Sequence, residues 1–352
     1  MQPKAAANAP KELGKPLALT SQVTRVRFGG PGGNVLAAAC FDGTVRRWDL
    51  SGKEPVEQPA LGGHNGWVTD IAWGSGQFFS ADSWGRLSAW HLAGMEAKPH
   101  WSVEAAHDGW ARGVAFSTRA LGVATCGKDG FARLWDRARG TRVWETETKT
   151  DLLSVCFAPD GGHVFAGDLF GTVHEFAVAS GKKTRTFEVK ELHKLDRIQD
   201  VGGAKCLLAS PDGKTLFVGG AEPKTGGFVQ CVPLLIAFDL ASGKRMSQWK
   251  GANDNEGYVT DLAWHEDGFV VFTTSGQPGQ GKFHIWKPGD EKTLFSGGKL
   301  PNCHSVALHP DGERIAVSAT NANSSGNGRV KGARGEYPAN TSPIQLWSLP
   351  KL

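Results

Sequence analysis

The sequence has 352 residues, including 47 Gly and 18 Pro; 21% of the residues are charged, and the net charge is only +4. This turn-rich composition excludes a disordered or fibrous chain, and the length allows a core that needs no disulfide or metal. Because no run of five or six like charges accompanies the weak positive charge, neither a nucleic acid nor a membrane is an expected partner.

The six cysteines lie mostly in apolar runs and never form a C-x-x-C pair. This predicts reduced, buried thiols rather than a metal site or disulfides. Residues 1–13 are rich in Ala, Pro and Lys without an apolar segment, so no secretory signal is predicted. No stretch approaches the ~18 uninterrupted apolar residues of a membrane span. We therefore expect a flexible tail over residues 1–13 and a cytoplasmic location.

One pattern recurs along the rest of the chain: a strand ending in an aromatic or apolar residue, a second strand, a tight turn with Gly, and a third strand with Trp or Phe near its end. The first strands of seven copies end at Phe28, Trp73, Phe116, Phe157, Ala209, Trp264 and Leu308. The third strands carry Trp48, Trp90, Trp135, Phe176, Phe238, Trp286 and Trp347. First-strand ends are 41 to 55 residues apart, close to the ~40–45 residues of one propeller blade.

These copies predict one all-β domain over residues 14–352, a seven-bladed β-propeller. The blades are expected at about 20–60, 61–105, 106–148, 149–190, 191–251, 252–297 and 298–349. The last copy has a third strand near Trp347 but no fourth strand after it. We expect a strand at 15–19, Lys-Pro-Leu-Ala-Leu, to complete the seventh blade and remove its open edge.

The third copy is the clearest. It contains Ala106-His-Asp-Gly-Trp110, Lys128-Asp-Gly130 and Arg133-Leu-Trp-Asp136. This copy resembles a WD40 repeat, and the resemblance extends over nearly the whole chain. It implies a buried hydrogen-bonded tetrad made of His107, Thr125, Asp129 and Trp135. A closed network of this kind gives each buried polar group a partner. The abundance of Gly, Ala and Trp and the degenerate repeats also resemble stand-alone WD40 proteins of bacteria.

Other copies depart from this pattern. Blade one has Ala38 where the hydroxyl of the tetrad belongs. Blade two keeps His64, Ser80 and Trp90, but Trp84 occupies the turn position of the aspartate. We therefore expect these blades to depend more on apolar packing than on hydrogen bonds.

The starts of the first strands are expected to meet at one face of the propeller, and the turn with Trp84 at the same face. The residues at these starts are Gln22, Trp67, Trp110, Asp151, Gly203, Tyr258 and Asn302. Exposed aromatic side chains there would offer contact area to a partner at low entropic cost. The alternative is that they pack, half buried, on neighbouring loops.

Two copies are longer than the rest. Third-strand marks are 62 residues apart in blade five and 61 in blade seven, against 41 to 48 elsewhere. The extra length falls in the segments 191–203, 221–232 and 320–343. We expect these loops to add to the same face, since recognition concentrates in long loops on rigid scaffolds.

Further down the strands, Arg25, Asp70, Ser154 and Asp261 are expected to rim the central channel, where they could hold an ion, water or a basic side chain of a partner. Ordinary hydrated channel walls are the alternative. No G-x-S-x-G, H-E-x-x-H or P-loop motif is present. A lactonase-like metal-dependent hydrolase would need convergent acidic and amide ligands. Asp70, Asp151, Asp261 and Asn302 are the candidates for them.

The sequence thus predicts a non-catalytic scaffold, without cofactor, that docks a protein or peptide as a monomeric propeller within a larger assembly. The alternative function is the metal-dependent hydrolase with its ion in the channel. A weaker alternative is a nucleic-acid assembly factor, suggested by Arg329, Lys331 and Arg334 in the seventh-blade loop.

Overall fold

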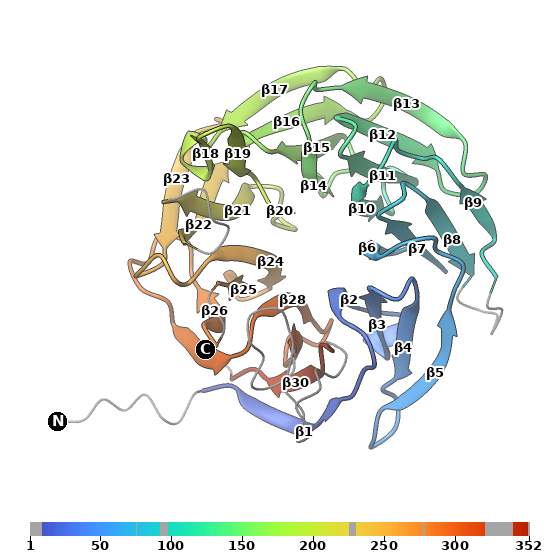
Figure 1. Ribbon diagram of the computed structural model, residues 1–352, viewed down its shortest axis with the longest axis vertical. Coiled ribbons are helices and arrows are strands. Elements are labelled where there is room, and N and C mark those ends of the chain that lie inside the picture. Colours follow the sequence, from blue (N-terminus) through green and yellow to red (C-terminus); the bar gives the residue numbers. More distant parts are fainter. Residues whose placement is uncertain are drawn as a thin grey trace.

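The computed structural model describes residues 9–74, 76–91, 98–224, 230–276, 279–320 and 341–350. These residues form seven four-stranded antiparallel sheets arranged around one axis, so the predicted seven-bladed propeller is confirmed (Figure 1). Within the described ranges, the helical turns are two short 3-10 segments, η1 (Pro31–Gly33) and η2 (Lys190–Leu192). No helix in this described part of the chain is long and apolar enough to cross a membrane.

Each of the first six blades consists of four strands that follow one another in the sequence. Blades one to three are β2 (Val23–Gly29), β3 (Val35–Cys40), β4 (Val45–Asp49), β5 (Val56–Leu61); β6 (Val68–Trp73), β7 (Gln77–Asp82), β8 (Leu87–His91), β9 (Trp101–Val103); and β10 (Ala111–Ser117), β11 (Gly122–Gly127), β12 (Phe131–Asp136), β13 (Arg142–Glu147). Blades four to six are β14 (Leu152–Phe157), β15 (His163–Asp168), β16 (Thr172–Ala177), β17 (Lys183–Glu188); β20 (Cys206–Ala209), β21 (Thr215–Pro223), β22 (Cys231–Asp239), β23 (Arg245–Lys250); and β24 (Tyr258–His265), β25 (Phe269–Ser275), β26 (Gly281–Trp286), β27 (Phe295–Leu300). A separate hairpin of β18 (His193–Asp196) and β19 (Gln199–Gly202) lies between blades four and five.

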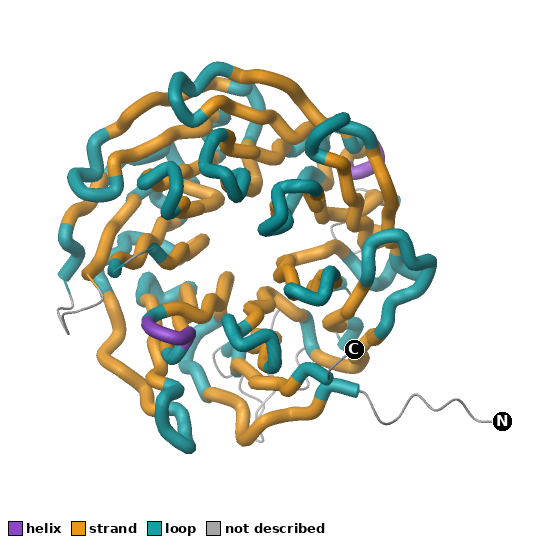
Figure 2. Tube along the Cα trace, turned by 180° about the vertical axis from the view of Figure 1, so that it is seen from behind, coloured by secondary structure: helices purple, strands orange, loops and turns teal. Residues whose placement is uncertain are grey.

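The seventh blade joins the two ends of the described chain. Its strands are β28 (Cys303–Leu308), β29 (Arg314–Ala319), β30 (Ile344–Ser348) and β1 (Lys11–Leu17). β1 runs antiparallel to β30, and the two lie side by side in Figures 1 and 2.

The closing strand therefore begins at Lys11 and ends at Leu17, not at 15–19 as expected, and the predicted tail overlaps it. The prediction followed the apolar residues up to position 19, which lies beyond the end of the strand at Leu17. As the outermost strand of its blade, β1 is largely exposed, so it needs no apolar run, and its edge position tolerates Pro16.

The first strands lie nearest the axis and the fourth strands lie outermost (Figure 1). Second strands are enclosed on both faces, and all six residues of β7 are buried. The aromatic residues of the third strands fill the spaces between blades. Trp90 is 2% exposed and packs with Ala37, Ala39 and Phe78 from blades one and two. The residues that mark the repeat in the sequence are thus the residues that hold adjacent blades together.

Candidate docking face

The four predicted tetrad residues of blade three lie within hydrogen-bond distance of one another. His107 Nδ1 is 2.9 Å from Asp129, and its Nε2 is 2.8 Å from the Thr125 hydroxyl. That hydroxyl accepts the indole N–H of Trp135 at 2.8 Å. Burial lowers the pKa of His107, which keeps the ring neutral near pH 7. The network joins a loop, the second strand, a turn and the third strand of the blade.

Blade two contains a second complete tetrad, which corrects the expectation that it lacks the aspartate. His64 Nδ1 lies 3.0 Å from Asp82, and His64 Nε2 lies 2.7 Å from the Ser80 hydroxyl. The indole N–H of Trp90 donates to the same hydroxyl at 2.9 Å. The carboxylate comes from the end of β7 rather than from the turn, and its side chain is still long enough to reach the histidine.

This arrangement leaves the next turn position to Trp84. The Asp82 carboxylate accepts the backbone N–H groups of Trp84 and Arg86, at 2.9 and 3.0 Å, and so holds the turn. Gly85 adopts φ +87°, and a Cβ there would lie 2.0 Å from the His107 carbonyl oxygen. The turn therefore packs directly on the loop of blade three while the Trp84 side chain is 69% exposed.

Blade four repeats this turn. Asp168 accepts the N–H groups of Phe170 and Thr172, at 2.9 and 2.8 Å, and also contacts His174 Nε2 at 2.9 Å. Phe170 occupies the position that Trp84 has in blade two, and it is 44% exposed. The shared signal in the sequence is an aspartate three residues before a glycine, with an aromatic residue between them.

Four aromatic side chains surround a recess of about 870 Å³ on the face formed by these turns and by the connections from fourth to first strands, which we call the loop face. The Phe41 ring stacks on Trp67 with centroids 4.4 Å apart, and Trp67 meets Trp110 edge to face at 5.4 Å. Trp84 lines the same recess, and Trp67 is 43% exposed. We call this site the aromatic recess. Three of the predicted face residues thus come together, and Phe41, which the sequence analysis missed, joins them.

None of the other predicted face residues lines the aromatic recess. Tyr258 does not line the aromatic recess; the ammonium of Lys205 lies 5.4 Å from its ring centroid. Asp151 forms an ion pair with Arg112 at 3.0 Å. Gln22 and Asn302 each accept a backbone hydrogen bond through the carbonyl oxygen, from Phe41 and Thr320 respectively.

Three of the four predicted channel residues form an ion-pair network across blades. Arg25 bonds Asp70 at 3.0 Å and Asp261 at 2.9 Å, and Arg27 bonds Asp261 at 2.7 Å. Burial would raise the pKa of Asp261, but the charges of the two arginines outweigh it and lower that pKa to about 2. Ser154 instead donates to the Ala204 carbonyl oxygen at 2.7 Å.

This network bears on the metal hypothesis. The carboxylates of Asp70 and Asp261 face arginines, and Asp151 faces another arginine, so the positive charge that a divalent cation would supply is already present. Within the described ranges, no group of three or more His, Cys, Asp or Glu side chains is arranged to hold a metal ion.

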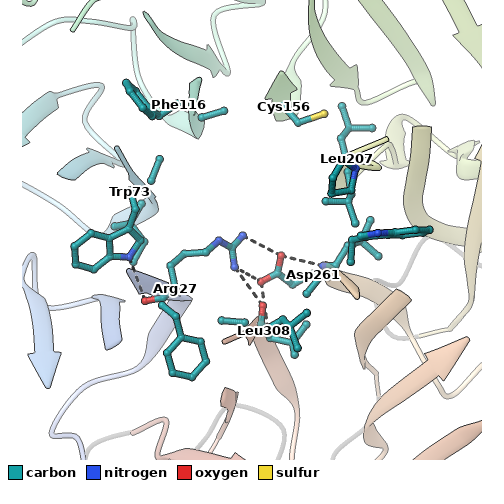
Figure 3. A pocket seen from close by; sticks show the side chains of 18 of the residues that line it. Arg27, Trp73, Phe116, Cys156, Leu207, Asp261 and Leu308 are labelled. Atoms are coloured by element: carbon teal, nitrogen blue, oxygen red, sulfur yellow. Dashed lines mark hydrogen bonds and ion pairs between the residues drawn. The ribbon is translucent and has the colours of Figure 1, made fainter. Parts of the chain in front are cut away.

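A second recess, of about 810 Å³, opens at the other end of the channel. Figure 3 shows Arg27 reaching Asp261 there, with Trp73, Phe116 and Leu207 around them. This recess was not predicted from the sequence, although two of these residues, Trp73 and Phe116, are first-strand ends that mark the repeats.

The long connection 191–203 contains the hairpin of β18 and β19 rather than an irregular loop. Its Leu195 is 60% exposed and its Ile198 99% exposed. His193 bonds Asp200 at 2.7 Å and packs edge to face on Phe170 at 4.9 Å, which joins the hairpin to the turn of blade four. Residues 221–223 and 231–232 of the segment 221–232 extend β21 and β22, and residues 225–229 lie outside the described residues. Residues 321–340 of the seventh-blade loop, including Arg329, Lys331 and Arg334, lie outside the described residues.

Comparison with known proteins supports the repeat. The family profile "WD domain, G-beta repeat" matches residues 16–49 and 100–136. The chain is 27% identical over 126 residues, 33% of its length, to small ribosomal subunit protein RACK1 of Schizosaccharomyces pombe, and the match covers 36% of that protein. It is 28% identical over 255 residues, 69% of its length, to the U3 small nucleolar RNA-associated protein 4 homolog of Mus musculus, of which 34% is covered. It is also 27% identical over 86% of its length to telomerase protein component 1 of Mus musculus, of which 10% is covered.

These matches span about a third of the first two relatives and a tenth of the third. The chain is a seven-bladed β-propeller in which two segments match the WD40 repeat and blades two and three each contain a hydrogen-bonded tetrad. The bacterial resemblance stays a prediction.

Proposed function

We propose that the chain is a non-catalytic docking platform whose loop face binds a protein or peptide partner. The observation that carries this proposal is the placement of the exposed aromatic side chains. Among the described residues, the exposed large hydrophobic side chains include three aromatic ones, Trp67, Trp84 and Phe170. All three belong to the loop face, and the exposed Leu195 and Ile198 of the hairpin extend it.

The opposite end and the outer rim differ. Their exposed apolar side chains are aliphatic or Met and lie singly near strand starts or turns, as Val56, Val143 and Met246 do. Single exposed apolar residues are ordinary on protein surfaces, whereas clustered exposed aromatic residues mark interaction sites. The contrast favours the loop face as the place of contact.

The relatives support membership of a larger assembly. One is named as a ribosomal subunit protein and another as a protein associated with a small nucleolar RNA. The metal-dependent hydrolase receives less support, because Arg25 already bonds both Asp70 and Asp261.

The test compares partner capture by three forms of the full chain expressed in the native host: the wild type, Trp84→Ser with Ile198→Ser, and Met246→Ser as a control. Met246 is 51% exposed on an outer strand and away from the loop face. We expect proteins that co-purify with the wild type and the control to fall about tenfold or more with the double variant. Equal capture by the double variant, or loss with the control alone, would place the contact elsewhere.

A further inference from the structure

The aromatic recess has walls suited to a cation. The Phe41 and Trp67 rings are stacked with an interplanar angle of 13°, while Trp67 and Trp110 stand at 82° to each other. Phe41, Trp67, Trp84 and Trp110 all line the recess, and the face of an indole carries the negative part of the ring quadrupole. A positive group placed against these faces is attracted, and Trp and Tyr faces are the strongest such sites.

The charge of the lining points the same way. Of the twelve residues that line the recess, two are acidic, Asp42 and Asp108, and none is Lys or Arg. Both acidic residues are exposed. The whole chain has a net charge of +4, so this acidic lining runs against the average charge of the protein. An anionic partner segment would meet repulsion here, and a cationic one would meet attraction.

The same cluster already carries a guanidinium group. The Arg112 guanidinium lies 4.8 Å from the Trp110 ring centroid and is paired with the carboxylate of Asp151 at 3.0 Å. An aromatic face together with a nearby carboxylate is thus a combination that this protein uses for one of its own arginines. Trp84, which is 69% exposed, lines the recess together with the carboxylate-bearing Asp42 and Asp108, so an aromatic ring and carboxylates also occur together there.

We propose that the aromatic recess binds an arginine side chain of an extended partner segment. Arginine fits better than lysine because its guanidinium is planar, stacks on aromatic faces and donates in a fork that matches carboxylates. The volume of about 870 Å³ exceeds that of one side chain, so residues flanking the arginine enter as well. This inference rests on the proposed docking function and names the chemistry of the partner.

The experiment titrates the full chain with three blocked tripeptides, acetyl-Gly-X-Gly-amide, where X is arginine, lysine or citrulline. Citrulline has nearly the shape of arginine but no charge. Binding is followed by the indole N–H signals in NMR spectra and by calorimetry. We expect the arginine peptide to shift the indole signals of Trp67 and Trp84 and to bind about tenfold more tightly than the citrulline peptide.

Variants locate the site. Asp42→Asn with Asp108→Asn should weaken arginine binding about threefold, because each exposed carboxylate contributes modestly. Trp84→Ser should abolish it, and Met246→Ser should leave it unchanged. Citrulline binding equal to that of arginine, or no effect of the double Asn variant, would overturn the proposal. Lysine binding as tight as arginine binding would overturn the choice of arginine.

The outcome is separable from that of the proposed function. If the double variant Trp84→Ser with Ile198→Ser loses partner capture but the arginine peptide does not bind, the docking face stands and the arginine assignment fails. If the peptide binds but the double variant captures partners as well as the wild type does, the arginine site stands and the proposed function fails.

Discussion

Blades two and three form the same hydrogen-bonded tetrad with a carboxylate from different places. In blade three, Asp129 projects from the turn between the second and third strands, so the turn position is occupied by a residue of the tetrad. In blade two, Asp82 at the end of β7 supplies the carboxylate and leaves the turn position to Trp84. The two tetrads have similar distances from histidine to hydroxyl, 2.7 and 2.8 Å.

The difference shows how a blade can keep its internal hydrogen-bonded network and still present an exposed aromatic side chain in the turn. When the aspartate moves to the strand end, the turn gains a surface position without loss of the network. Blade four confirms the relation between the two features, since Asp168 lies at a strand end and Phe170 is exposed in the turn. Exposed aromatic turn residues thus accompany strand-end aspartates in both blades.

The largest expected effect tests whether the two tetrads are equivalent. Trp90→Ala and Trp135→Ala each remove a buried indole and leave a hydroxyl without its donor, so each should lower the free energy of unfolding by about 3–5 kcal/mol. Urea unfolding followed by far-UV circular dichroism measures both, with Met246→Ala as the control. A loss in only one of the two variants would show that the blades do not depend equally on their networks.

The fold could be predicted because the same side-chain pattern recurs in every blade and has a physical cause. Every blade must place a large side chain such as Trp48 or Trp286 between itself and its neighbour, so the same position recurs seven times. The closing strand was placed less well, since the exposed β1 leaves little apolar pattern to read.

The candidate site was predictable only in part. Trp67, Trp84 and Trp110 could be assigned to one face from strand order. The tetrad with Asp82 could not be predicted, because the spacing of residues in the sequence does not show how far a side chain reaches in the fold. Contacts between distant blades could not be predicted from the sequence either. Arg25 contacts Asp261 of blade six, more than two hundred residues away, only because the ring of blades closes.

A smaller effect on stability is expected when only the buried carboxylate of Asp82 is removed. Burial would raise the pKa of Asp82, but hydrogen bonds from His64 and from the N–H groups of Arg86 and Trp84 lower it. Its stabilising contribution is therefore complete above the unfolded-state pKa of about 3.9 and is lost as the pH falls toward the lower folded-state value. Asp82→Asn should cost about 1–3 kcal/mol at pH 7.

The difference in unfolding free energy between the wild type and Asp82→Asn should then stay nearly constant from pH 7 to about pH 5 and narrow as the pH falls below about 4, as measured by urea titrations at each pH. Asp129→Asn should behave in the same way, because hydrogen bonds from His107 and Arg133 outweigh burial and lower the pKa of Asp129. A gap that stays constant with pH would mean that these carboxylates do not stabilise the tetrads through their charge.

The smallest expected change in stability belongs to the turn residue itself. Because Trp84 is 69% exposed, Trp84→Ser should alter the free energy of unfolding by no more than about 0.5 kcal/mol. Phe170→Ser in the matching turn of blade four should cost more than Trp84→Ser, because the Phe170 ring is less exposed and packs on His193 of the hairpin. Trp90→Ala in the same blade as Trp84 should meanwhile be strongly destabilising. If Trp84→Ser instead lowered stability by as much as Trp90→Ala, the indole would belong to the core, and a strand-end aspartate would no longer account for an exposed aromatic residue in the turn.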